Sequence, residues 1–143
     1  MKLVLDNSVC MRWCFGDGMP ADLAYAESAM EALAAGSATV PVIWSLEVAN
    51  VLVRAEHTGL IDEAHSAAFL TTLRKLRITT DPAGAEHALT DTLNLARRHR
   101  LSAYDAAYLE LALREHIPLA TLDANLRQAC RGSGAALFGQ NDV

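Results

Sequence analysis

A short apolar run near the start of the chain, Leu3-Val4-Leu5, stops at the polar segment Asp6-Asn7-Ser8. A strand without polar alternation is typical of the centre of a parallel sheet, because helices cover both faces of such a sheet. Further short strands are predicted at residues 39–43, 77–80 and 119–122, and segments with helical spacing of apolar residues lie between them. The sequence therefore predicts an α/β fold with a short central parallel β-sheet flanked by helices on both faces.

Helical periodicity and capping signals predict where the helices lie. Asp62 and Ser102 are expected as N-caps, since a short polar side chain there accepts a hydrogen bond from the first turn. The helix that follows the second strand is apolar nearly all round, which predicts deep burial. The predicted helices are 20–36, 45–57, 62–76, 85–98, 102–116 and 124–130, and residues 135–138 are a candidate final edge strand.

The length and composition fit one compact domain that spans residues 1–143. Hydrophobic residues make up 52% of the chain and charged residues 20%, which supports a sizeable core and argues against disorder. The formal net charge of -5 counts against a nucleic-acid partner, which usually binds a basic surface. This objection weakens if several acids form one metal site, because bound divalent ions reverse the local charge.

The cysteine pattern and the absence of a long apolar segment predict a cytoplasmic protein with no membrane contact. Cys10, Cys14 and Cys130 are odd in number and lack the spacing of a metal or redox motif, which indicates reduced thiols. The first apolar run is too short for a signal peptide, and no stretch approaches the ~18 uncharged residues that a membrane span needs.

Carboxylates follow two of the predicted strands and stand early in two of the helices. Asp6 and Asp123 come directly after apolar strands, and parallel strands bring such positions to the same edge of a sheet. Each is also a plausible N-cap. Asp105 fits a capping box with Ser102, so it has a structural interpretation of its own, and both interpretations stay open.

Glu47 is the most informative of these acids, because it lies on the helix that is apolar nearly all round. The helix N-terminus stabilises a carboxylate there by up to about 1 kcal/mol, whereas burying an unpaired carboxylate costs far more. A cation would resolve this imbalance, with Asn50 one turn on as a supporting residue. A pair with Arg54 is the alternative, although the two are seven residues apart.

Four acids at one edge of a sheet repel one another at neutral pH, and a divalent cation removes that repulsion. Hard oxygen ligands suit Mg²⁺ or Mn²⁺, and no cluster of histidine and cysteine argues for zinc. The five histidines show no ligand spacing. The predicted metal ligands and catalytic residues are Asp6, Glu47, Asp105 and Asp123.

Segments around these acids resemble, in order, the motifs of VapC-type PIN-domain toxins of toxin–antitoxin modules. The resemblance is specific as an ordered set and covers nearly the whole chain, while each motif alone is weak. The similar segments are Leu5-Asp6-Asn7-Ser8-Val9, Leu46-Glu47-Val48-Ala49-Asn50, Ser102-Ala103-Tyr104-Asp105-Ala106, Pro118-Leu119-Ala120-Thr121-Leu122-Asp123 and Leu137-Phe138-Gly139.

The resemblance implies a PIN-like fold and a Mg²⁺- or Mn²⁺-dependent endoribonuclease that hydrolyses RNA phosphodiester bonds with a metal-activated water. It also implies a homodimer and inhibition by a cognate antitoxin protein. Ser8 and Thr121 are expected as hydroxyl supports of the first and fourth acids. The helices at 20–36 and 62–76 are the candidates for partner contact.

Basic residues that could contact RNA stand in two places. Arg12 follows the first acid closely, and the densest basic run contains Arg97, Arg98 and Arg100. Short basic runs at helix ends are more often solvated and complement the helix dipole, and this alternative stays open.

Two other functions remain to be compared with the nuclease. A haloacid-dehalogenase-like phosphatase also starts from an aspartate after the first strand, but it needs a second aspartate where this chain has Ser8. A catalytically inactive PIN-like module that binds a protein or a nucleic acid is the second alternative. The presence of all four acids argues against it.

Overall fold

A parallel four-stranded sheet runs through the centre of the molecule, in the order β3-β2-β1-β4. The computed structural model describes residues 1–139. Every strand pair is parallel, and Leu5 of the first strand pairs with Ala120 of the last. This confirms the predicted α/β class. The strands are β1 (Lys2–Leu5), β2 (Ser37–Val40), β3 (Ile78–Thr80) and β4 (Leu119–Ala120).

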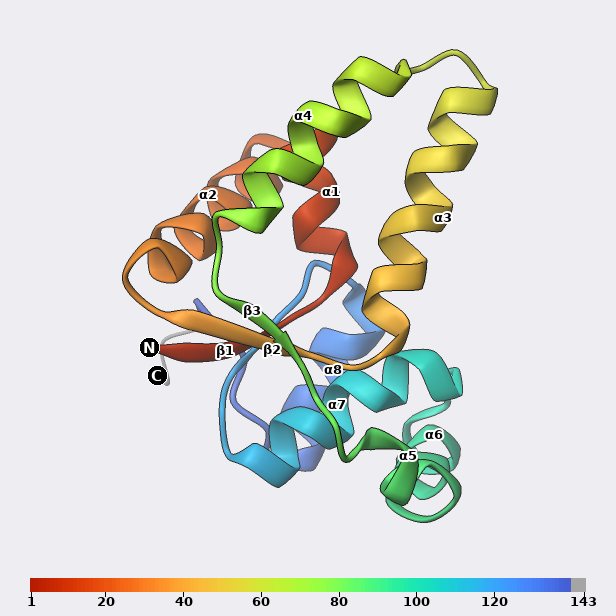
Figure 1. Cartoon of the computed structure of the whole chain (residues 1–143). Coiled ribbons are helices and arrows are strands. Elements are labelled where there is room, and N and C mark those ends of the chain that lie inside the picture. The colour runs from red at the N-terminus through yellow and green to blue at the C-terminus, as the bar shows by residue number, and fades with distance from the viewer. Residues whose placement is uncertain (140–143) are drawn as a thin grey trace.

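Helices cover both faces of this sheet, as predicted. Figure 1 shows α1 to α4 on one side of the strands and α5 to α8 on the other. The first group is α1 (Asn7–Phe15), α2 (Pro20–Ala35), α3 (Ile43–His57) and α4 (Glu63–Arg74). The second is α5 (Gly84–His87), the π-helical turn η1 (Ala88–Thr92), α6 (Leu93–His99), α7 (Ala103–Glu115) and α8 (Ala124–Ser133).

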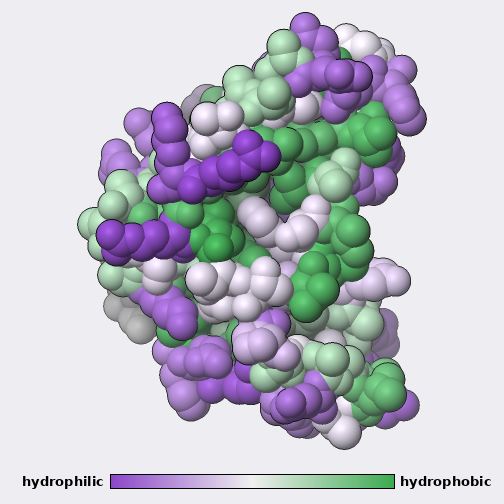
Figure 2. Space-filling model, viewed as in Figure 1, coloured by the Kyte–Doolittle hydropathy of each residue, from purple (hydrophilic) through white to green (hydrophobic). Residues whose placement is uncertain are grey.

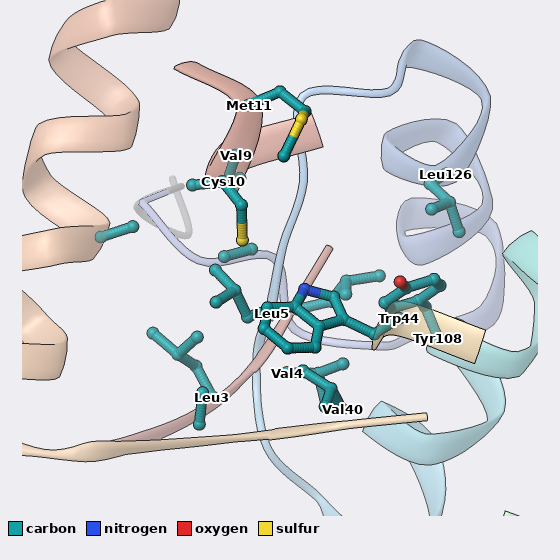
Figure 3. Close-up of a cluster of buried hydrophobic side chains, with 14 of the residues drawn as sticks. Leu3, Val4, Leu5, Val9, Cys10, Met11, Val40, Trp44, Tyr108 and Leu126 are labelled. Carbon is teal, nitrogen blue, oxygen red and sulfur yellow. The ribbon is translucent and has the colours of Figure 1, made fainter. Parts of the chain in front are cut away.

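The first strand lies at the centre of the core. Leu3, Val4 and Leu5 are all fully buried, and Figure 3 shows them among side chains from both helical layers, including Trp44 and Tyr108. Burying a leucine or valine of this kind stabilises the fold by about 1.5–3 kcal/mol. The apolar run therefore gives β1 its central place in the sheet.

Several predicted boundaries differ from the structure. Residues 7–15, for which no helix was predicted, form α1. The second strand ends at Val40 rather than residue 43, and α3 begins two residues earlier than expected. Residues 135–138 form only an isolated bridge, between Leu119 and Leu137. The helix predicted at 85–98 exists, but a π-helical turn interrupts it.

The prediction that α3 is deeply buried is wrong. Its buried side chains are Trp44, Val48, Leu52 and Ala55, which form one face. Leu46 is 65% exposed. Figure 1 shows the reason, since α3 stands at the outside of its layer and projects beyond the sheet. Within residues 1–139, no helix is long and apolar enough to cross a membrane.

Candidate metal centre

The four predicted acids lie at the carboxyl edge of the sheet, where the strand order reverses. Asp6 follows β1 and Asp123 follows β4. These two strands are neighbours in the sheet, with Leu5 paired to Ala120, although 115 residues separate the two partners along the chain. Glu47 stands near the start of α3, and Asp105 in the first turn of α7. Ligands of open α/β sheets bind at such an edge, beside the point of reversal.

Asp6 is the most buried of the four, with 6% of its surface exposed. Its Oδ2 atom accepts hydrogen bonds from Ser8 Oγ at 2.6 Å and from Thr121 Oγ1 at 2.7 Å. Both hydroxyls in turn accept backbone N–H groups, from Leu122 and Asp123. Each hydroxyl proton is therefore directed at the carboxylate, which fixes its orientation. Within the described chain, Oδ1 accepts no hydrogen bond.

The hydroxyl supports differ in part from the prediction. Ser8 supports the first acid as expected. Thr121 donates to Asp6 as well, and its contact with Asp123 is through the backbone N–H of that residue, not through the carboxylate. Two hydroxyls thus hold one carboxylate, one from the start of α1 and one from the segment after β4.

The carboxylates act on one another electrostatically. Burial raises the pKa of Asp6, the two hydroxyls partly offset this, and the charges of Asp105 and Asp123 raise it further. Burial also raises the pKa of Glu47, with smaller contributions from the charges of Asp6 and Asp105. The pKa of Asp105 is raised by burial and then by the charge of Asp123. The four side chains therefore form one cluster of interacting negative charge.

Glu47 has a partner that the sequence did not reveal. The hydroxyl of Tyr108 donates to its Oε1 atom at 2.6 Å, and Tyr108 is fully buried. No ion pair joins Glu47 to Arg54 in the described chain, so the alternative role of this acid is not observed. Tyr108 stands one helical turn after Asp105, and a buried tyrosine usually has a hydrogen-bond partner. That spacing was the available signal.

The structural roles considered for the last two acids are partly present. Asp123 is the N-cap of α8, since its Oδ1 atom accepts from the Leu126 backbone at 2.9 Å. Ser102 is the N-cap of α7, and its hydroxyl accepts from the backbone N–H of Asp105 at 3.1 Å. The Ser102 hydroxyl also lowers the pKa of Asp105, but burial and the charge of Asp123 outweigh this effect. The capping box is thus half formed, and the Asp105 carboxylate remains available to a ligand.

The other predicted site residues are not all at the cluster. Asn50 is exposed and its side chain forms no hydrogen bond within the described residues. Arg12 forms an ion pair with Asp17 at 2.9 Å, and Arg97 donates to Asn94 at 3.3 Å. Arg98 and Arg100 line a separate cavity, which is described below.

The chemistry of the cluster fits a hydrated divalent cation. Its donors are carboxylate oxygens, which suit Mg²⁺ and Mn²⁺, and Mg²⁺ commonly binds through one or two carboxylates while it keeps several waters. No three of the four acids have ligand atoms within 4.8 Å of one another, a spacing that leaves room for such waters. Within residues 1–139, Oδ1 of Asp6 accepts no hydrogen bond, and this atom and the carboxylate of Asp105 are the donors best placed to meet a ligand.

A different group of side chains does meet that 4.8 Å spacing, namely His87, Asp91 and Glu110. The prediction that no histidine has ligand spacing was therefore wrong for His87. Arg114 donates to Glu110 at 2.8 Å and to Asp81 at 2.6 Å in the same place. The permanent positive charge of Arg114 beside Glu110 opposes a bound cation. This group is therefore an ion-pair network rather than a metal centre.

Comparison with known proteins agrees with this architecture. The chain is similar to PAE2754 from Pyrobaculum aerophilum, whose crystal structure matches with a TM-score of 0.63 and 21% identity, over 100% of this chain and 92% of that one. This likeness shows the fold. No curated protein matches the chain. PIN domains are generally nucleases that use divalent metals. The model of the PIN domain matches residues 3–132, and the chain therefore belongs to the PIN domain family.

Proposed function

We propose that this protein is a Mg²⁺- or Mn²⁺-dependent endoribonuclease and the toxin of a toxin–antitoxin module. The observation that carries the proposal is the buried Asp6, held by two hydroxyls with one oxygen left open, within a cluster of four acids. A carboxylate of this kind is costly to bury without a cation. We assign metal binding to Asp6, Glu47, Asp105 and Asp123.

The chain's own residues position the reaction. Ser8 and Thr121 hold Asp6, and Tyr108 holds Glu47, so both carboxylates keep one orientation before a substrate arrives. A divalent ion bound there supplies a nucleophilic water and neutralises charge on the phosphodiester. The pre-set orientation avoids reorganisation during the reaction, which is the usual protein contribution to such catalysis.

The proposal includes one PIN-like domain over residues 1–143, a cytoplasmic location, an RNA substrate, an antitoxin and a homodimer.

Exposed large hydrophobic residues support a protein partner, since contiguous apolar surface usually marks an interface. Val42, Leu89 and Tyr104 line a cavity of about 400 Å³, and Leu46 and Val53 are further exposed hydrophobic residues, on α3. Figure 2 shows hydrophobic residues on both sides of the hollow between α3 and α5.

The homodimer is expected to use this surface rather than α2 or α4, neither of which carries an exposed large hydrophobic residue. Sedimentation of the purified protein at micromolar concentration should give twice the chain mass. Leu46→Glu should shift the mass towards the monomer, because it places a charge in an apolar interface. A monomer at all concentrations would contradict the dimer.

Metal binding is tested by thermal unfolding in a Mn²⁺ titration. Mn²⁺ at a hundredfold excess over its Kd should stabilise the fold by about 2.7 kcal/mol, which is on the order of 10 °C in Tm. The raised pKa values of Asp6, Glu47 and Asp105 mean that the metal-free protein loses stability as pH rises through them. The Mn²⁺ effect should therefore grow from acidic to neutral pH.

The matched control for this titration is Asp91→Asn, which removes an exposed acid outside the cluster. It should leave the Mn²⁺ shift unchanged, whereas Asp105→Asn should reduce it strongly. An unchanged Tm in the unsubstituted protein at every Mn²⁺ concentration would refute the metal centre.

A further inference from the structure

A polar cavity of about 430 Å³ lies between the end of α6 and the face of α8. Arg98, His99 and Arg100 line it from one side, and Asn125 and Gln128 from the other. Among the described residues, no carboxylate lines this cavity, although the chain as a whole is acidic. The cavity thus brings together two arginines and two side-chain amides in a protein whose formal net charge is -5.

The cavity adjoins the acid cluster through two short stretches of backbone. Asn125 stands two residues after Asp123, in the first turn of α8. Arg100 stands two residues before Ser102, the N-cap of the helix that carries Asp105. Two residues of chain span at most about 7 Å, so the backbone of Asn125 lies within that distance of the backbone of Asp123. A strand bound at the acids can therefore reach this cavity.

The two arginines are available to a ligand. Neither Arg98 nor Arg100 forms an ion pair in residues 1–139, while Arg12 and Arg114 both do. Guanidinium groups and side-chain amides are the usual donors to phosphate oxygens of a nucleic acid. An acidic peptide or a second copy of this acidic chain could bind the arginines but would have no use for the neighbouring acid cluster. An RNA strand could contact both, because a metal ion at the acids would bind its phosphate.

The backbone at Arg100 has a conformation that is unfavourable for a residue with a side chain. Arg100 is the C-cap of α6 and has a left-handed conformation, with φ of 53°. Glycine or asparagine is the ordinary residue at such a position, because a β-carbon is unfavourable there. His116 has the same conformation at the end of α7, so the strain at Arg100 supplies a matched control and is not itself evidence of binding.

We propose that this cavity is a phosphate subsite, which holds a phosphodiester of the RNA strand next to the one at the acid cluster. Arg98 and Arg100 contact the phosphate oxygens, and Asn125 and Gln128 donate from α8. The inference rests on the proposed ribonuclease function and names the surface that positions its substrate. Arg97, which donates to Asn94, is outside the subsite.

The test compares Arg100→Gly with His116→Gly. Both residues are left-handed helix C-caps that are not glycine, with φ of 53° and 56°, but His116 ends α7 at the far end from Asp105. Both variants relieve the same backbone strain and should stay folded with an equal or higher Tm. Only Arg100→Gly removes a cation from the cavity.

Binding is measured by fluorescence anisotropy of a fluorescein-labelled single-stranded RNA in Ca²⁺, across a salt series. Arg100→Gly should weaken binding about tenfold, the equivalent of one charge-assisted hydrogen bond. It should also make the slope of log affinity against log salt shallower by about 0.7. Arg98→Gln should have a similar effect, and His116→Gly should leave affinity and slope unchanged.

The outcomes separate the two proposals. Binding by the unsubstituted protein that Arg100→Gly and Arg98→Gln leave unchanged would overturn the subsite alone. An equal loss in His116→Gly would also overturn it, since the cause would then be the helix end. No binding of RNA by the unsubstituted protein would overturn the ribonuclease and the subsite together.

Discussion

Asp6→Asn should abolish the RNA cleavage and the growth arrest that we expect from the proposed toxin on expression. The substitution removes the charge of the acid but keeps its shape, and an amide oxygen can still accept from Ser8 and Thr121. Loss of an outer-shell partner of a metal site costs about 10–100-fold in affinity or activity, and loss of a ligand should exceed that. Cleavage of total RNA and colony formation after induction are the measurements.

Asp105→Asn should have the same effect, because the substitution removes the charge of a proposed metal ligand and keeps its shape. Asp91→Asn, which changes an exposed acid of the ion-pair network, is the control and should remain toxic. Full toxicity of a well-expressed Asp6→Asn protein would refute the assignment of the site.

Stability of the same variants separates loss of function from loss of fold. The pKa of Asp6 is raised in the folded state above its ordinary value of 3.8. The stability linked to protonation of Asp6 is therefore present below pH 3.8 and is lost as the pH rises through the raised pKa. Asparagine carries no charge at any pH. Metal-free Asp6→Asn should therefore unfold at an equal or higher urea concentration than the unsubstituted protein at neutral pH.

Arg114→Ala should destabilise the fold by about 3–5 kcal/mol, the usual cost of leaving buried charges without their partner. Arg114 donates to Asp81 at 2.6 Å and to Glu110 at 2.8 Å, and both carboxylates are about 4% exposed. The guanidinium is the main reason that the pKa of Asp81 is lowered. Its removal leaves two buried acids together on α7 and after β3.

Urea unfolding with Arg97→Ala as the control measures this effect. Arg97 is exposed and forms a single bond to Asn94, so its loss should change the free energy of unfolding by less than about 0.5 kcal/mol. The pKa of Asp81 is lowered in the folded state. The stability that ionised Asp81 contributes is therefore present above pH 3.8 and is lost as the pH falls through the lowered pKa. The difference between Arg114→Ala and the unsubstituted protein should shrink in acid. A cost below 1 kcal/mol at neutral pH would contradict the role given to Arg114.

The sequence by itself determined the elements whose signals are local. The unbroken apolar run of Leu3 to Leu5 predicted a central strand, since only a strand covered on both faces needs no polar side. Asp62 and Ser102 predicted two helix starts, because an N-cap bonds to a backbone group three residues away. The positions of Asp6 and Asp123 after parallel strands predicted that they would share one edge of the sheet.

The tertiary structure alone decided which side chains touch. Tyr108 holds Glu47 across 61 residues, and Thr121 holds Asp6 across 115. Neither contact has a local pattern, since it depends on how strands and helices pack. The exposed face of α3 has the same origin, because an apolar sequence shows what a helix can bury, while the neighbouring layers determine how much of it they cover.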